Sequence, residues 1–125
     1  MNFAHTFGHA IETVTSYQIP HGTAVAIGMI MANHISVSRG LLDSEIAARM
    51  EQVLLRVIHI SVNIAIYSFD EFLASIKKDK KQVNDNLTAV LMTDIPEEML
   101  IVHDVQKNEI KEALQHFQRI CCAQV

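Results

Sequence analysis

Apolar side chains recur at helical spacing from the start of the chain. They fall on positions that share one face of a helix, namely Phe3, Phe7, Ala10, Ile11 and Val14. This spacing predicts a first helix from Asn2 to about Thr15, interrupted by Gly8, which costs up to about 1 kcal/mol relative to alanine. The helix is expected to end before Pro20, because a proline disfavours helical backbone at the residue that precedes it.

Two further helices are predicted in the first half of the chain. The segment 23–39 is apolar on nearly every side, which is typical of a buried central helix, and Gly40 is a suitable residue to end it. Asp43 is placed to cap the next helix, over residues 44–57. The inner face of that helix is expected to consist of Ile46, Met50, Val53, Leu54 and Val57.

The second half begins with a weaker helical signal and a short β element. Ser68 and Glu71 have the spacing of a capping box, which predicts a helix that reaches about residue 78. Two short apolar runs, 87–92 and 99–103, are separated by a distance that suits an antiparallel pair, with Pro96 in the turn between them.

A last helix closes the predicted domain. Asp104 is placed to cap a helix from about Gln106 to Cys121. We find no internal repeat, low-complexity stretch or linker in the sequence. The pattern therefore predicts one domain over residues 1–125, mostly α-helical, with one small antiparallel β element.

The composition indicates a folded domain and limits the partners and the compartment that we expect for it. Half of the 125 residues are hydrophobic and 19% are charged, which is enough for a core in about one domain. The net charge of −4 argues against nucleic acid as a partner. The longest apolar run is far shorter than the roughly 20 residues of a membrane span, and no secretory signal is visible. Adjacent Cys121 and Cys122 are poorly placed to pair, which indicates a reducing cytoplasm.

Histidines are the main candidates for chemistry, since the chain has seven. Four of them have no partner that the sequence indicates and are expected at unremarkable positions, namely His34, His59, His103 and His116. His5 and His9 lie four residues apart, which places both imidazoles on one helix face, and Glu12 falls on the same face. Spacing alone leaves open whether the pair binds a metal, acts in catalysis or belongs to the core.

A third imidazole, His21, stands on a turn between Pro20 and Gly22, where the buried helix is expected to begin. The positive end of a helix dipole favours a neutral imidazole, and the neutral form is the one that binds zinc. A catalytic zinc typically has three protein ligands and one open position. Histidines of this chain could supply two of the three.

The flanking residues form two motifs that resemble a known family. "NFAHTFGHAIE" at residues 2–12 and "PHGTAVAIGM" at residues 20–29 resemble the paired signature of the 3-dehydroquinate synthase family, N-F-G-H-T-x-G-H-A-x-E and H-G-E-A-V-A-x-G-M. "KDKK" at residues 78–81 and the order of the helices are also similar. Two positions depart from the signature, because Ala4 replaces a glycine and Thr23 replaces a glutamate.

The resemblance implies a two-domain enzyme. In the family, an N-terminal Rossmann-like domain holds NAD, and a helical C-terminal domain supplies most contacts to metal and substrate. This chain resembles the helical domain only, because it has no G-x-G-x-x-G loop and no parallel-sheet pattern. We therefore expect the C-terminal part of a longer enzyme, with the NAD-binding domain as its partner, and the resemblance also implies a homodimer.

The resemblance also implies roles for the histidines. His5 and His21 match zinc ligands, with cobalt as an alternative metal, and the third ligand is a glutamate of the segment that this chain lacks. His9 matches a histidine that contacts substrate and helps the phosphate group leave. We therefore expect these three side chains to converge in space. Glu12 lies about 10.5 Å from His5 along the helix axis, so it is not expected to complete the zinc shell.

Two further positions match substrate contacts in the family. Asn2 matches an asparagine that contacts the substrate, and one of Lys80 and Lys81 matches a lysine on the phosphate side. A lysine suits a phosphate because it presents a point charge.

The implied reaction is a phosphate-eliminating cyclisation. The resemblance implies a lyase that converts 3-deoxy-D-arabino-heptulosonate 7-phosphate to 3-dehydroquinate and phosphate, in the shikimate pathway of aromatic amino acid biosynthesis. Two other hypotheses remain open, namely another sugar-phosphate cyclase such as 2-deoxy-scyllo-inosose synthase, and a helical fragment without a catalytic role. By itself the chain is expected to have no cyclase activity, to bind no NAD and to bind zinc weakly.

Overall fold

The computed structural model describes residues 11–12, 19–58, 70–71, 74, 87–94 and 99–122 of the chain. It contains helix α2 (His21–Ser38), helix α3 (Ser44–Val57), strand β1 (Leu87–Met92), strand β2 (Met99–Val105) and helix α5 (Lys107–Cys122). The prediction of a mostly helical chain is confirmed for the part that the structure describes.

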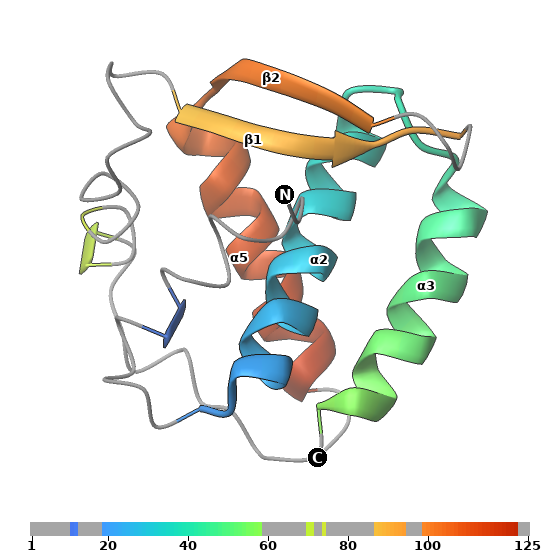
Figure 1. Cartoon of the computed structure of the whole chain (residues 1–125), viewed down its shortest axis with the longest axis vertical. Coiled ribbons are helices and arrows are strands. Elements are labelled where there is room, and N and C mark those ends of the chain that lie inside the picture. The colour runs from blue at the N-terminus through green and yellow to red at the C-terminus, as the bar shows by residue number, and fades with distance from the viewer. Residues whose placement is uncertain are drawn as a thin grey trace.

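Helix α2 is the centre of the fold (Figure 1), where α3 and α5 pack against it and β1 crosses near its C-terminal end. Most of its side chains are buried, as expected for a helix that is apolar on nearly every side. Helix α5 buries a single stripe with helical spacing against it, formed by Ile110, Ala113, Leu114 and Phe117. The strands add Leu91 and Val105 to this core.

The C-terminal end of α2 is closed by a glycine, as predicted. Gly40 has a φ of +75°, in the left-handed region that a residue with a Cβ rarely adopts. Its N–H donates to the carbonyl oxygen of Val37 at 3.0 Å, and the N–H of Leu41 donates to that of Ser36 at 2.9 Å. These two bonds form a Schellman motif, which satisfies carbonyls at the helix end.

The expected cap of α5 is wrong, because Asp104 lies in β2 rather than at the helix start. The strand continues to Val105, two residues beyond the predicted end, so α5 begins one residue later than expected. Gln106 precedes the helix, and its backbone N–H donates to Glu109 Oε1 at 2.9 Å. The glutamate thus reaches back to a backbone donor at the helix start, in the manner of a capping box.

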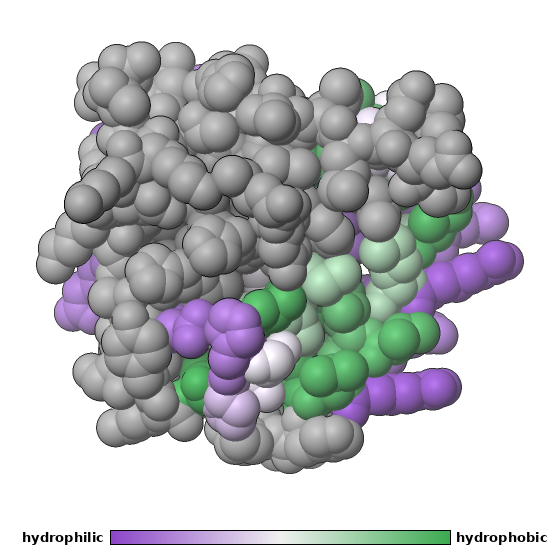
Figure 2. Space-filling model, viewed as in Figure 1, coloured by the Kyte–Doolittle hydropathy of each residue, from purple (hydrophilic) through white to green (hydrophobic). Residues whose placement is uncertain are grey.

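The predicted inner face of α3 is also partly wrong, although the bounds of the helix are as predicted. Asp43 precedes the helix, but its side chain makes no capping hydrogen bond. Ile46, Val53 and Val57 are 38%, 59% and 45% exposed, and no residue of α3 is fully buried. Among the described elements α3 packs mainly on α2, so part of its apolar stripe faces outward, as Figure 2 shows on the lower right.

Strands β1 and β2 pair antiparallel, with a register shift between Leu87 and Ala89. Other predictions fall outside the described residues, namely the first helix apart from residues 11–12, most of the helix predicted to reach residue 78, and the turn at Pro96. None of the described helices has both the length and the apolar run that crossing a membrane would require.

Candidate functional site

His21 stands at the first position of α2, with its side chain 73% exposed. Pro20 precedes the helix with an extended ψ of 145°, and its carbonyl oxygen accepts a hydrogen bond from the N–H of Ala24 at 3.0 Å. Proline fixes the chain direction just before the helix, and most of α2 from Thr23 to Ser36 is buried. The imidazole of His21 therefore projects into solvent from a well-anchored backbone.

Glu12 lies beside His21, a contact that the sequence analysis missed. Its Oε1 is 3.1 Å from His21 Nδ1, and its side chain is only 13% exposed. A carboxylate can only accept, so the hydrogen between these atoms belongs to Nδ1. When the ring is neutral, this tautomer leaves Nε2 unprotonated, which is the form that a metal ion binds.

The other predicted site residues lie outside the described residues, namely Asn2, His5, His9, Lys80 and Lys81. The predicted convergence of three histidines therefore remains a prediction. Among the described residues, no three histidine, cysteine or acidic side chains are close enough to hold a metal ion. Within the described residues, the candidate site consists of His21 and the Glu12 side chain in contact with it.

Thr23 is buried in the first turn of α2, with 5% of its surface exposed. It replaces the glutamate of the family signature. The position faces the protein interior near the helix start, where a threonine introduces no charge and a carboxylate would need a partner.

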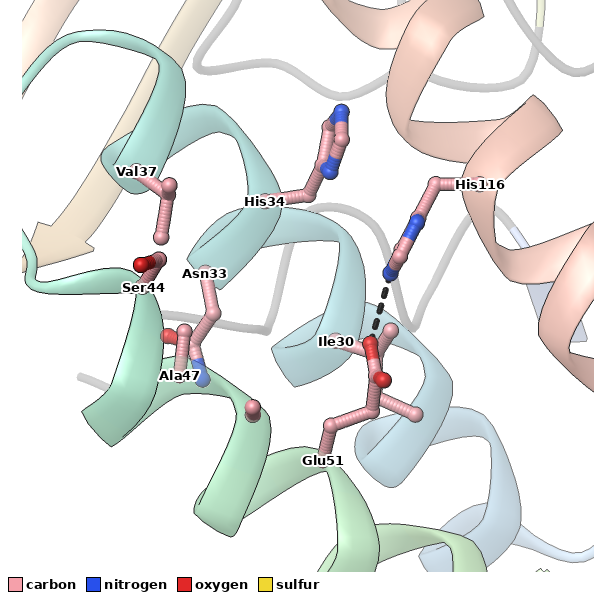
Figure 3. A pocket seen from close by; sticks show the side chains of 9 residues that line it. Ile30, Asn33, His34, Val37, Ser44, Ala47, Glu51 and His116 are labelled. Carbon is pink, nitrogen blue, oxygen red and sulfur yellow. Dashed lines mark hydrogen bonds and ion pairs between the residues drawn. The ribbon is translucent and has the colours of Figure 1, made fainter.

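A second polar cluster lies between α2, α3 and α5 (Figure 3). The rings of His34 and His116 stack with centroids 4.5 Å apart and planes inclined by 19°. His116 Nε2 is 2.6 Å from Glu51 Oε1, so this pair links α5 to α3. Sequence reasoning expected both histidines at unremarkable positions, and no local motif could have paired residues so far apart in the chain.

Burial lowers the pKa of His34, and the neighbouring His116 lowers it further. Arg119 acts in the same direction, whereas the carboxylates of Glu112 and Glu51 act against it. His34 is therefore held toward its neutral form at the wall of the cavity.

The cavity beside this cluster has a volume of about 170 Å³. Asn33 lines it, is 3% exposed and donates from Nδ2 to the sulfur of Met50 at 3.8 Å. Its Oδ1 has no hydrogen-bond partner among the described residues. His34 is 13 residues beyond His21, about 20 Å along α2 at 1.5 Å per residue, so the cavity is separate from the site at the helix start.

The matching family and the similar sequences carry the same enzyme name. The family described as 3-dehydroquinate synthase C-terminal matches residues 1–82. A 3-dehydroquinate synthase of Campylobacter jejuni subsp. doylei is 39% identical over 119 residues, which are 94% of this chain and 33% of that protein. A 3-dehydroquinate synthase of Nitratiruptor sp. is 38% identical over 120 residues, which are 95% of this chain and 34% of that protein.

Two solved structures have a similar fold. ValA, a 2-epi-5-epi-valiolone synthase from Streptomyces hygroscopicus with NAD+ and Zn2+ bound, matches with a TM-score of 0.77 and 25% identity, over 95% of this chain and 32% of that one. A 2-deoxy-scyllo-inosose synthase with carbaglucose-6-phosphate, NAD+ and Co2+ matches with a TM-score of 0.74 and 25% identity, over 92% and 32%. The chain thus spans about a third of the length of the relatives it matches.

Proposed function

The chain belongs to the 3-dehydroquinate synthase C-terminal family, and we propose that it is the metal- and substrate-binding part of such an enzyme. The proposed reaction converts 3-deoxy-D-arabino-heptulosonate 7-phosphate to 3-dehydroquinate and phosphate. The observation that carries the proposal is His21, an exposed imidazole on a buried helix, with Nδ1 bonded to a carboxylate and Nε2 left for a metal. From the resemblance of its motif, we propose it as a zinc ligand.

The chemistry of His21 fits the metal that the family uses. Zinc and cobalt both accept neutral imidazole, and the two structures of similar fold contain Zn2+ and Co2+. When bound, such an ion polarises a substrate oxygen as a Lewis acid. His5 is the second proposed ligand, and a glutamate outside this chain is the third.

The remaining site residues are proposed to act on the substrate. His9 would move a proton at the phosphate oxygen as the phosphate group leaves, which suits an imidazole near neutral pH. Asn2 would orient the substrate through its side-chain amide. Lys80 or Lys81 would bind the phosphate, because an ammonium group attracts it as a point charge.

The proposed partners follow from the share of the relatives that this chain spans. An NAD-binding segment would supply the group that takes a hydride from the substrate and returns it. We propose a cytoplasmic enzyme that combines this segment with the present chain and forms a homodimer, while the chain alone is inactive.

A second candidate is another sugar-phosphate cyclase. It is favoured by the fold match to a 2-deoxy-scyllo-inosose synthase and by Thr23, which stands where the family signature has a glutamate. The two candidates differ in substrate and share the arrangement of metal and NAD, so the substrate separates them.

A chimaera tests the proposal. This chain replaces the matching third of the Campylobacter jejuni subsp. doylei 3-dehydroquinate synthase, and phosphate release is measured with NAD and zinc. Two substrates are compared, namely the heptulosonate 7-phosphate and glucose 6-phosphate, whose carba analogue is bound in the 2-deoxy-scyllo-inosose synthase.

We expect the chimaera to release phosphate from the heptulosonate 7-phosphate. The His21→Ala variant should lose this release, whereas the control Glu45→Gln, at an exposed position of α3, should retain it. Release only from glucose 6-phosphate would favour the second candidate. A folded chimaera that binds NAD and releases phosphate from neither substrate would contradict the catalytic assignment.

A further inference from the structure

We propose that Glu12 is the positioning residue for His21, fixing its tautomer and its direction so that Nε2 faces the metal. The inference rests on the proposed function, since it concerns the same metal ligand. Glu12 acts through His21 in this account and does not itself bind the metal.

The two side chains differ in how firmly they are held. His21 is 73% exposed, and an exposed histidine at a helix start is free to change its rotamer unless a partner holds it. Glu12 is 13% exposed, and the adjacent Ile11 is 1% exposed within the hydrophobic core. The carboxylate is therefore presented from a core-anchored backbone, and the 3.1 Å contact restrains the exposed imidazole.

The tautomer follows from the acceptor. Because the carboxylate has no hydrogen to donate, Nδ1 must carry one, and the lone pair of a neutral ring then lies on Nε2. Metal-binding histidines almost always donate their other ring N–H to a carboxylate, a carbonyl or water, which fixes the ring and raises its basicity. The pair Glu12–His21 has this arrangement.

The charge of Glu12 also complements the helix. The N-terminal end of a helix carries a partial positive charge, and the first turn of α2 contains no acidic side chain. Glu12 brings a carboxylate to this end from another segment of the chain. The same contact therefore holds His21 and places negative charge next to the helix start.

A rival arrangement makes Glu12 a direct ligand. A zinc ion with bonds of about 2.0–2.2 Å to both Nδ1 and Oε1 would also hold these atoms little more than 3 Å apart. The two arrangements assign opposite nitrogens of His21 to the metal, so the nitrogen that carries the hydrogen in the zinc-bound ring distinguishes them.

The first experiment reads which ring nitrogen of His21 carries the hydrogen, first without metal and then at saturating zinc. The 125-residue chain is labelled with 15N at histidine, and long-range 1H–15N correlations are recorded above the titration range of histidine. We expect His21 to carry its hydrogen on Nδ1 in the parent chain and in the control Glu45→Gln. Glu12→Ala should shift the signal toward a mixture, and Glu12→Gln should shift it less, because an amide oxygen can still accept.

The second experiment measures the zinc affinity of the chimaera, which contains the third proposed ligand, by competition with a chelating dye. We expect Glu12→Ala to weaken binding about 10- to 100-fold, the usual effect of removing a partner of a ligand. Glu12→Gln should weaken it less, and His21→Ala should weaken it more than either. Circular dichroism checks that each variant is folded, and the isosteric Glu12→Gln preserves the test if the alanine variant unfolds.

Three outcomes would overturn the inference. An unchanged tautomer and zinc affinity in Glu12→Ala would overturn the positioning role and leave the proposed function standing. A zinc-bound parent chain with the His21 hydrogen on Nε2, together with loss of zinc in Glu12→Ala as complete as in His21→Ala, would make Glu12 a ligand. Zinc affinity that is unchanged in His21→Ala would overturn the proposed metal ligand, and the positioning role with it.

Discussion

Removing the carboxylate of Glu109 tests how the start of α5 is tied to the end of α2. Arg39 donates to it twice, from Nε to Oε2 at 2.7 Å and from Nη2 to Oε1 at 2.8 Å. The backbone N–H of Gln106 donates to Oε1 at 2.9 Å. Arg39 and Glu109 are 22% and 18% exposed, so the pair is largely shielded from water. One carboxylate thus serves both an ion pair and a helix start.

The magnitudes follow from this double use. A hydrogen bond to a charged group contributes about 1.5–3 kcal/mol, whereas a fully exposed ion pair contributes at most about 1 kcal/mol. For a bidentate pair that keeps some exposure, we expect Arg39→Met to lower the free energy of unfolding by about 2 kcal/mol. Glu109→Ala also removes a capping contact, worth typically about 1 kcal/mol, so it should cost about 3 kcal/mol.

Urea denaturation of the two single variants and the double variant measures these values. The double variant should cost about as much as Glu109→Ala alone, with a coupling energy of 1 kcal/mol or more in the range expected of residues in contact. A coupling energy near zero, or a Glu109→Ala variant less destabilised than Arg39→Met, would refute the reasoning.

Three further predictions concern stability. The lowered pKa of His34, caused by burial and then by His116, means that the unfolded chain takes up a proton that the folded chain resists. Stability should therefore fall as the pH drops through about 6.5, and His34→Gln should flatten this dependence in urea titrations; an unchanged pH profile would contradict the assignment. Gly40→Ala should lower the free energy of unfolding by about 1–2 kcal/mol in the same assay, because its φ is +75°, and no effect would contradict the left-handed turn. Phe117→Ala, at a fully buried position, should cost about 3–5 kcal/mol and lower the thermal midpoint strongly; a loss below 1 kcal/mol would show that α5 is not packed as described.

The backbone of the described part could largely be predicted from the hydrophobic pattern. Continuous apolar character predicts the buried helix α2, and apolar positions at helical spacing among polar ones predict α3 and α5. Gly40 predicts the end of α2, because glycine can adopt the left-handed backbone found there. These are local properties of the chain, so the sequence contains them directly. The end of β2 was predicted less accurately. The strand continues through Asp104, the residue that was predicted to cap α5.

The side-chain arrangement could be predicted much less well, because it depends on which elements meet. The apolar stripe of α3 predicts a buried face, yet Val53 is exposed because among the described elements α3 packs mainly on α2. The stacking of His34 on His116 joins α2 to α5 and has no local signal. The contact of Glu12 with His21 joins residues nine positions apart, which motif spacing does not specify.

The most direct test of the account is the position of a bound zinc ion in a crystal structure of the chimaera, located by anomalous scattering. The account predicts zinc about 2.0–2.1 Å from Nε2 of His21, with Nδ1 still bonded to Glu12. Zinc on Nδ1, zinc ligated by Glu12, or zinc at a site that excludes His21 would contradict it.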